Sequence, residues 1–409
     1  MSSASSISVF SKIPKTIWAI GFVSLLLNGS AVAIFTMYPI YITTVLGWST
    51  ASLGFFEGLV EAAGWLMRLL SGTISDMLRK RKVLLVIAYG LTAVSRLIFP
   101  LATSGLIMSI GRVVDRIGNG IQATPRDALV GDMTPPEHKG ACYGMRTTLG
   151  LLGSCLGAGL LMLYFRTVGT DYNSAFWWAL IPTLLAILIL VLFVQDRPQK
   201  PADQENTVET KKATAKISLN DILMLPSGYW KVILVSFLFM LSNYSGVFMI
   251  LQVKHAGLQE CDLPLVMILQ NLSAFIAAFP AGYLSDRLGR RKLLAGGFLL
   301  VIISNMLLAS TATMMLVLSG VVVWGLQMGI NQSLLLAKVC DTAPDELRGS
   351  AFGIYYVIVG FALFITNAVS GNLAKYFSNE YIFYASSVMA GLAMIALLML
   401  PAEDKKQTA

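Results

Sequence analysis

Acidic and basic side chains lie within two otherwise apolar stretches of the chain. In residues 52–74, Glu57, Glu61 and Arg68 are spaced i, i+4 and i+11, which places them on one face of a helix. Residues 106–130 carry a longer stripe at three- or four-residue spacing, made of Arg112, Asp115, Arg116, Asn119, Gln122, Arg126 and Asp127. Charge inside a membrane is rare and usually functional. We therefore interpret Glu57, Glu61 and Asp115 as proton carriers, with purely structural ion pairing as the alternative.

Composition identifies the environment of these charges. Of the 409 residues, 56% are hydrophobic and 13% are charged, whereas a soluble domain carries about 25% charged residues. Long unbroken apolar runs argue against a soluble enzyme and against a transmembrane β-barrel, whose strands alternate. The net charge of +8 comes from short basic clusters between the apolar runs, so it indicates membrane topology rather than nucleic-acid binding. We expect an all-α, multi-pass integral membrane protein.

Twelve apolar runs approach or exceed the length of about 20 residues that crosses a bilayer. They divide into two sets of six on either side of a polar, charged segment. The predicted spans are 17–45, 52–74, 83–101, 106–130, 141–164, 175–194, 229–253, 263–284, 293–309, 314–337, 350–373 and 382–400. The predicted domains are an N-terminal bundle (1–195), a cytoplasmic linker (196–226) and a C-terminal bundle (227–409). Residues 217–225 are expected to form a short amphipathic helix on the membrane surface.

Lys and Arg residues determine the predicted orientation. With the N-terminus inside, nineteen basic residues fall in cytoplasmic segments, and only Arg166, Lys254 and Lys375 fall outside. That bias predicts both termini in the cytoplasm. The expected location is a bacterial inner membrane or a plasma membrane.

The two sets of spans are related by an internal duplication. The loop after the second span reads GTISDMLRKRK, and 210 residues later the loop after the eighth span reads GYLSDRLGRRK. At an offset of 209, Asp132 recurs as Asp341 and Gly140 as Gly349. Two matches at almost one offset predict a six-helix unit repeated in parallel, about an axis along the membrane normal.

The duplicated loop, G-x-x-x-D-(R/K)-x-G-(R/K)-(R/K), resembles the signature of the major facilitator superfamily of secondary transporters. The copy at residues 282–291 fits fully, whereas the copy that begins at Gly72 has Met77 and Arg79 where a basic residue and a glycine are usual. Gly111 and Arg112 resemble the arginine motif of the family's fourth span. The resemblance covers essentially the whole chain and implies two pseudo-symmetric six-helix bundles.

The resemblance also implies roles for residues in and beside these loops. We expect gates that exchange salt bridges between states, and the alternative is that the loops only fix topology and that the charges under them are structural. The predicted gating residues are Gly72, Asp76, Arg126, Asp127, Asp132, Gly282, Asp286, Arg287, Arg290 and Asp341.

The predicted solute-binding residues belong to spans that line the central cavity in the family, together with one neutral residue of the eighth span. They are Asn28, Arg112, Arg116, Asn243, Gln270, Gln327 and Asn331. For the neutral residues, hydrogen bonding between helices is the alternative.

The internal duplication serves as a control for the buried charges. At the corresponding positions of the second half, the charges of spans two and four are replaced by Met267, Asn271, Ala278, Val321, Trp324, Gly325, Leu335 and Leu336. The repeated architecture therefore does not require them. Spans two to four hold five arginines against four acidic residues, which favours an anionic or zwitterionic solute.

Together these patterns predict a secondary active transporter that moves a small organic solute by alternating access with proton symport. We expect no cofactor, no metal, no nucleic-acid partner and a monomer in the lipid bilayer, and no motif indicates an enzyme. A proton-coupled drug or metabolite efflux antiporter, an uncoupled facilitator and a non-transporting solute receptor stay open as alternatives. The Gly-Pro signature of many antiporters is missing from span five, where Ser154 replaces the proline.

Overall fold

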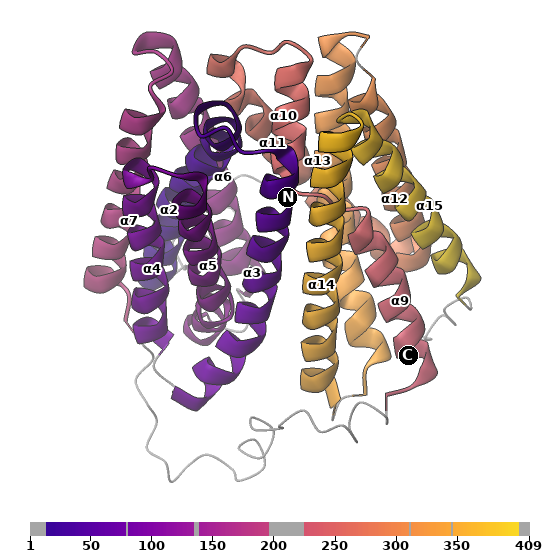
Figure 1. Cartoon of the computed structure of the whole chain (residues 1–409). Helices are drawn as coiled ribbons and strands as arrows, with labels where there is room; N and C mark the ends of the chain where they lie inside the picture. The colour runs from indigo at the N-terminus through magenta and orange to yellow at the C-terminus, as the bar shows by residue number, and fades with distance from the viewer. Residues whose placement is uncertain are drawn as a thin grey trace, which may run out of the picture. The chain divides into compact units, whose positions relative to one another are not determined.

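The computed structural model describes residues 14–78, 81–134, 139–195, 225–310, 312–344 and 347–400, and these are almost entirely helical. The helices of the first half are α2 (Lys15–Ile40), continued by the π-helical turn η1 (Tyr41–Val45), α3 (Thr50–Leu78), α4 (Arg81–Leu101), α5 (Gly105–Met133), α6 (Lys139–Thr167) and α7 (Tyr172–Phe193) (Figure 1). Those of the second half are α9 (Ser227–Leu241), α10 (Gly246–His255), the 3-10 turn η4 (Glu260–Asp262), α11 (Pro264–Leu288), α12 (Arg290–Ala309), α13 (Met314–Thr342), α14 (Arg348–Tyr376) and α15 (Glu380–Met399).

Hydropathy separates two helices from the rest. Within the described residues, ten helical segments are long and apolar enough to cross a membrane, with α2 and η1 forming one of them and α9 and α10 another. The helices α3 and α5 are not among the ten, although each has 29 residues. They are the helices that carry Glu57, Glu61 and the charged stripe, so their lower hydropathy reflects those side chains.

The duplication is visible in helix boundaries, caps and packing. The bounds of α13 and α14 are those of α5 and α6 displaced by 209 residues. Ser104 accepts a hydrogen bond from the Ile107 backbone N–H at the start of α5, and Thr313 caps α13 through Leu316 in the same way. In the first half α2 packs on α6 and α7, and α4 on α5 and α7; in the second half α9 packs on α14 and α15, and α12 on α13 and α15.

The chain divides into two compact units, and α3 contributes to both. Residues 1–47 and 63–214 form the first unit, and residues 48–62 and 215–409 form the second. In the second unit, the backbone of Gly54 lies against Gly371 of α14, and Gly58 lies against Phe364. In the first, Gly64 lies against the side chain of Arg116 on α5. The predicted linker lies outside the described residues except for Leu225 and Pro226, and the expected amphipathic helix does so except for Leu225.

The predicted seventh span is interrupted. The sequence predicts one helix over residues 229–253, whereas α9 ends at Leu241 and α10 begins at Gly246. Ser245 accepts a hydrogen bond from the Val247 backbone N–H at the start of α10. Non-helical backbone at membrane depth is tolerated only where protein or water satisfies its polar groups, so this break requires partners.

The contact between α2 and α6 depends on glycine. A Cβ atom on Gly29 would lie 3.0 Å from the Gly153 carbonyl oxygen, and a Cβ on Gly153 or Gly157 would overlap the backbone of α2. Helix association in lipid relies on such close approach, because apolar side chains gain little from leaving lipid for protein.

We expect Gly157→Ala to destabilise the protein by about 1–3 kcal/mol, because the added methyl group forces α2 and α6 apart. Gly159→Ala on the same helix is the matched control, since a Cβ there meets no atom within 4 Å. Thermal unfolding in detergent measures both variants. Equal melting temperatures for the two would contradict the close packing of these helices.

Candidate functional site

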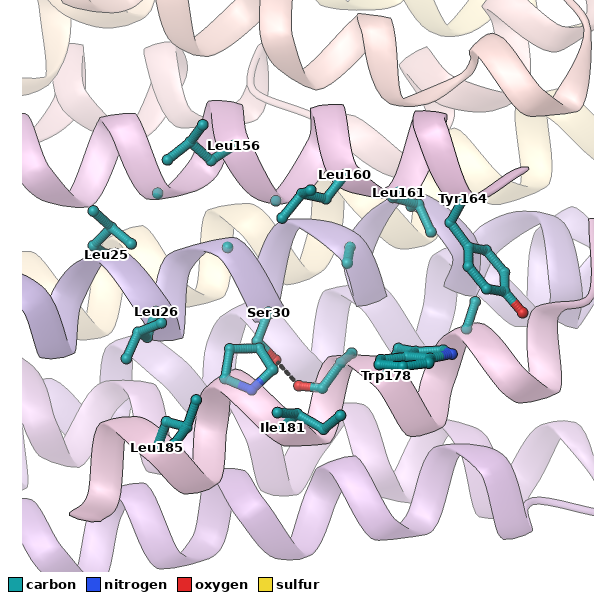
Figure 2. Close-up of a pocket in the computed structure, with 17 residues that line it drawn as sticks. Leu25, Leu26, Ser30, Leu156, Leu160, Leu161, Tyr164, Trp178, Ile181 and Leu185 are labelled. Atoms are coloured by element: carbon teal, nitrogen blue, oxygen red, sulfur yellow. Dashed lines mark hydrogen bonds between the residues drawn. The ribbon is translucent and has the colours of Figure 1, made fainter. Parts of the chain in front are cut away.

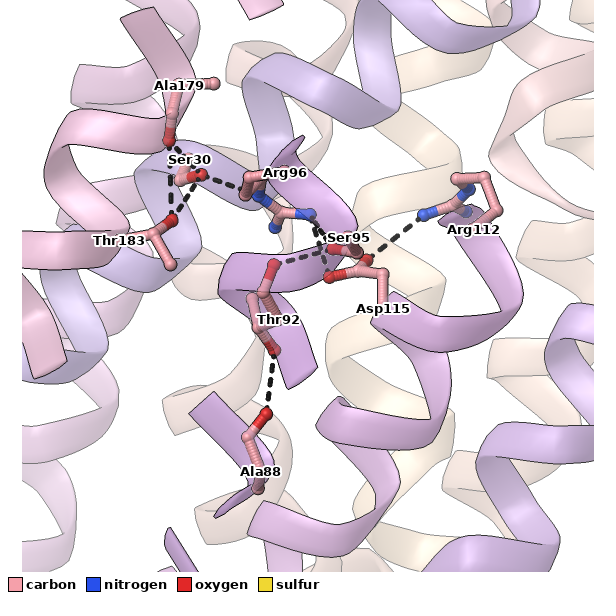
Figure 3. A network of polar contacts seen from close by, with 9 residues as sticks. All are labelled: Ser30, Ala88, Thr92, Ser95, Arg96, Arg112, Asp115, Ala179 and Thr183. Atoms are coloured by element: carbon pink, nitrogen blue, oxygen red, sulfur yellow. Dashed lines mark hydrogen bonds and ion pairs between the residues drawn. The ribbon is translucent and has the colours of Figure 1, made fainter. Parts of the chain in front are cut away.

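Asp115 of α5 is paired with two buried guanidinium groups of the first unit (Figure 3). Its Oδ1 lies 2.8 Å from Nη1 of Arg96 on α4, and its Oδ2 lies 3.4 Å from Nη1 of Arg112 one turn earlier. The exposed fractions are 0% for Arg96, 3% for Arg112 and 7% for Asp115. The sequence predicts Arg112 and Asp115 on one face of this helix. Arg96 is the partner that this prediction did not include.

The Arg96 guanidinium also reaches two helices beyond α5. Its Nε donates to the Ser30 hydroxyl of α2 at 2.9 Å, and the Thr183 hydroxyl of α7 donates to the same oxygen at 2.9 Å. Ser30 in turn donates to the Ala179 carbonyl at 2.7 Å (Figure 3). One serine hydroxyl therefore joins α2, α4 and α7 beside the Arg96–Asp115 ion pair.

Arg112 lies against aromatic rings of α2. The centroids of the Phe35 and Tyr38 rings are each 5.2 Å from its Cζ atom, a distance at which a cation is attracted to a ring face. Its ion pair with Asp115 is longer than that of Arg96. Asp115 thus holds Arg112 less closely than it holds Arg96.

The position of Arg96 is neutral in the second unit. Displaced by 209 residues, it becomes Asn305 of α12. Asn305 accepts a hydrogen bond from the Tyr244 hydroxyl at 2.9 Å and donates to the Ser386 hydroxyl at 2.7 Å. Both halves therefore have a buried polar centre at this position, but only the first half makes it from charges.

Glu57 lies in the second unit, at the break between α9 and α10. Its side chain is 0% exposed, and its Oε2 accepts a hydrogen bond from the Ser245 hydroxyl at 2.8 Å. Glu61, one turn further along α3, is half-buried. The structure thus brings Glu57, a predicted proton carrier, to a serine of the interrupted helix.

Side chains of two helices satisfy the backbone of this break. Asn367 of α14 accepts from the Ser245 backbone N–H at 2.7 Å, and Thr366 donates to the Leu241 carbonyl at 2.8 Å. Ser386 of α15 donates to the Ser242 carbonyl at 2.5 Å. Tyr244 within the break bonds Asn305 of α12. The backbone groups of Leu241, Ser242 and Ser245 at the interruption therefore have hydrogen-bond partners within the second unit.

The predicted neutral solute-binding residues mostly contact their own or neighbouring helices. Gln327 accepts a hydrogen bond from Asn331 at 3.0 Å, both are 1% exposed, and Asn331 packs against Gly297 of α12. Asn243 donates to the Phe239 carbonyl at 2.8 Å. Half-buried Asn28 lies against Gly150, and Gln270 donates to the Met328 sulfur at 3.6 Å.

An ion pair at the ends of the helices is repeated in the two units. Arg81 at the start of α4 pairs with Asp132 near the end of α5, and Arg290 at the start of α12 pairs with Asp341 near the end of α13. The offset is 209 residues in both positions, so Arg81 is equivalent to Arg290, whereas the loop comparison had aligned it with Arg291.

The other predicted gating residues fall into three groups. Asp127 is paired with Arg126 at 3.2 Å and with Arg146 at 3.4 Å. A Cβ on Gly72 would lie 3.5 Å from the Thr124 side chain, so α3 packs closely on α5 there. The remaining four positions, whose side chains lie outside the described part of the chain, are Asp76, Gly282, Asp286 and Arg287.

Several polar residues of these sites, among them Arg96, Ser30 and Ser245, were not among the sequence-predicted ones. Arg96 had a signal, since it is a lone charge in the apolar third span. Ser30 and Ser245 had none, because a serine in an apolar span does not differ in sequence from one that bonds its own helix, as Ser24 does to the Ile20 carbonyl.

We expect Asp115→Ala to destabilise the protein by about 3–5 kcal/mol, because it leaves the Arg96 charge buried without its carboxylate. Asp127→Ala is the comparison, since the Asp127 side chain is 48% exposed and its ion pairs contribute about 0–1 kcal/mol. Chemical or thermal unfolding in detergent measures the difference. A loss for Asp115→Ala no larger than for Asp127→Ala would contradict the buried ion-pair assignment.

We expect Asn367→Leu to destabilise the protein by about 1–3 kcal/mol, because the buried Ser245 backbone N–H loses its acceptor. Asn372→Leu, also on α14, is the matched control: Asn372 is exposed and bonds only the Ala368 carbonyl of its own helix among the described contacts. The same unfolding assay applies. Indistinguishable stabilities of the two variants would show that Asn367 does not hold the break.

The chain is similar to known proteins along nearly its whole length. The family model described as Major Facilitator Superfamily matches residues 17–269 and 257–409. An uncharacterized MFS-type transporter of Methanocaldococcus jannaschii is 28% identical over 395 residues, which cover 95% of this chain and 96% of that protein. The crystal structure of a D-xylose-proton symporter has a TM-score of 0.74 at 16% identity, covering 97% of this chain and 99% of its own. That of a nucleoside transporter has a TM-score of 0.76 at 13% identity, covering 95% and 100%.

These likenesses confirm the predicted all-α fold, with twelve membrane-spanning helices in two six-helix bundles, and the predicted multi-pass membrane location. They also confirm that the protein is a transporter and not an enzyme. The chain belongs to the Major Facilitator Superfamily.

Proposed function

We propose that this transporter moves a small organic solute bearing an anionic group, by alternating access, together with a proton that Glu57 carries. One observation supports the proposal above the others. The Glu57 carboxyl group is 0% exposed and accepts a hydrogen bond from the Ser245 hydroxyl at the α9–α10 break. Buried acidic residues in membrane transporters commonly form proton pathways.

The Ser245 hydroxyl is a suitable partner for a group that binds and releases a proton. Asp115 is bound to the guanidinium groups of Arg96 and Arg112, and a proton there would remove the charge that these arginines require. A hydroxyl group can both donate and accept a hydrogen bond. Ser245 can therefore donate to the Glu57 carboxylate and accept from its carboxylic acid, so it remains a partner in both protonation states. Among the three predicted proton carriers, we accordingly favour Glu57.

The proposed solute class rests on the arginines of α3, α4 and α5. The predicted spans two to four, which these helices contain, hold five arginines and four acidic residues, so their charges sum to one positive charge. We propose that Arg112, which Asp115 holds less closely than Arg96, and half-buried Arg116 attract the anionic group of the solute. The shared fold does not select a substrate, since a nucleoside transporter and a D-xylose-proton symporter have it too.

We expect Glu57→Gln to abolish proton-driven accumulation of solute while keeping exchange of solute across the membrane. The glutamine amide retains the size and a hydrogen bond of the protonated acid but cannot release a proton. The measurement uses proteoliposomes with an imposed pH gradient and a panel of radiolabelled carboxylates, amino acids, sugars and lipophilic cations, with internal pH recorded in parallel.

Asp171→Asn is the matched control. Asp171 caps α7, and hydrogen bonds from the Ser174 hydroxyl and from the Ser174 and Asn173 backbone N–H groups lower the pKa of this carboxyl group. Asparagine caps a helix equally well, so accumulation should stay at the wild-type level. Wild-type accumulation by Glu57→Gln would exclude Glu57 as the proton carrier. Flux of cations alone would exclude the anionic solute, and solute flux without proton movement would indicate a facilitator.

A further inference from the structure

An apolar cleft lies over α2 between α6 and α7 in the first unit (Figure 2). Its volume is about 430 Å³, within the range of about 300–1,000 Å³ for sites that hold small ligands. The floor is formed by small residues, among them Gly29, Ala33 and Gly157, and the walls carry Leu160, Trp178 and Leu185. Gly29, Ser30 and Ala33 of α2 leave the floor open, and Leu25 and Leu26 of the same helix also line the cleft.

The walls of this cleft face hydrocarbon. Leu160 is 66% exposed, Trp178 is 61% exposed and Leu185 is 46% exposed, and all three lie within helices that are apolar enough to span the membrane. At that depth the surrounding solvent is lipid acyl chain. The molecule available to enter the cleft is therefore a lipid acyl chain.

The one hydroxyl group at the floor is already engaged. Ser30 accepts hydrogen bonds from Arg96 and Thr183 and donates to the Ala179 carbonyl. A hydroxyl has one donor and two acceptor sites, so Ser30 has none left for a ligand. The occupant must accordingly be apolar along the floor.

The dimensions of the cleft fit one leaflet of a bilayer. Its lining on α7 runs from Ala175 to Leu185, ten residues or about 15 Å at the rise of an α-helix. The hydrocarbon core of a bilayer is about 30 Å thick, so one leaflet contributes about 15 Å. Tyr164 and Trp178 lie together at one end of the cleft (Figure 2), near the ends of α6 and α7, where such side chains commonly mark the lipid headgroup level.

We propose that this cleft is a binding site for one acyl chain of a membrane phospholipid, with its headgroup at the Tyr164–Trp178 end. The chain lies on the α2 face that carries Ser30, directly outside the hydrogen bonds that join α2 and α7 to Arg96. A bound chain stabilises this contact and therefore the position of the Arg96–Asp115 pair. The lipid is a structural ligand of the first unit and is distinct from the transported solute.

The test is a titration of delipidated protein in detergent micelles with a phosphatidylcholine whose acyl chains carry bromine, which quenches tryptophan fluorescence on contact. We expect saturable quenching at one lipid per protein, and Trp178→Phe should remove the saturable component. Ala33→Phe should weaken binding about tenfold or more, because losing the burial of two methylene groups suffices for that change. Gly159→Phe, at an open position of the same helix pair, should bind as the wild type does.

Several outcomes would overturn the proposal. The first is quenching that rises in proportion to the lipid fraction without saturation. The second is saturable quenching that survives Trp178→Phe. The third is equal lipid binding by the wild type and by folded Ala33→Phe. Thermal unfolding of each variant verifies folding, and Ala33→Leu replaces Ala33→Phe if the larger side chain prevents it. A dimer detected by light scattering, abolished by Ala33→Phe and accompanied by no saturable quenching, would instead assign the cleft to a second copy of the chain.

Discussion

A polar group inside a membrane must find its partner within the protein, because hydrocarbon offers none. This constraint explains the arrangement around Asp115, where two arginines, a serine and a threonine from four helices share their hydrogen bonds. It also explains the second unit, where Thr366, Asn367 and Ser386 satisfy the interrupted backbone between α9 and α10. In both units the polar residues specify which helices must be neighbours.

The duplicated scaffold and the polar groups placed on it have diverged to different degrees. Helix bounds, the Ser104 and Thr313 caps and the ion pairs of Arg81 and Arg290 recur 209 residues apart. At the centre of the units, in contrast, Arg96 is matched by the neutral Asn305. Features that start, end or anchor helices were retained in both copies. The interior polar groups differ, as expected where function is carried by sites grafted on a common fold.

Hydropathy and the internal repeat predicted the helices and the fold class, because length and apolarity are properties of each segment alone. The spacing of Arg112 and Asp115 also predicted that they share a helix face. The periodicity of a helix does not determine which neighbour that face meets, and so Arg96 and Ser30 could not be assigned. Glu57 and Glu61 share a helix face in sequence, but that spacing does not show that Glu57 meets Ser245. The α9–α10 break was missed because Ser242 and Ser245 are averaged with strongly apolar neighbours.

The interruption of α9–α10 has an electrostatic consequence. A continuous helix places the ends of its macrodipole at the two membrane surfaces, where water screens them. Because α10 begins at Gly246, a partial positive charge of about half a unit lies at its first turn, inside the membrane, beside the carboxyl group of Glu57. The opposite partial charge at the end of α9 lies near Ser242, where Ser386 donates a hydrogen bond. The charge of the membrane interior is therefore set by backbone geometry as well as by ionisable side chains.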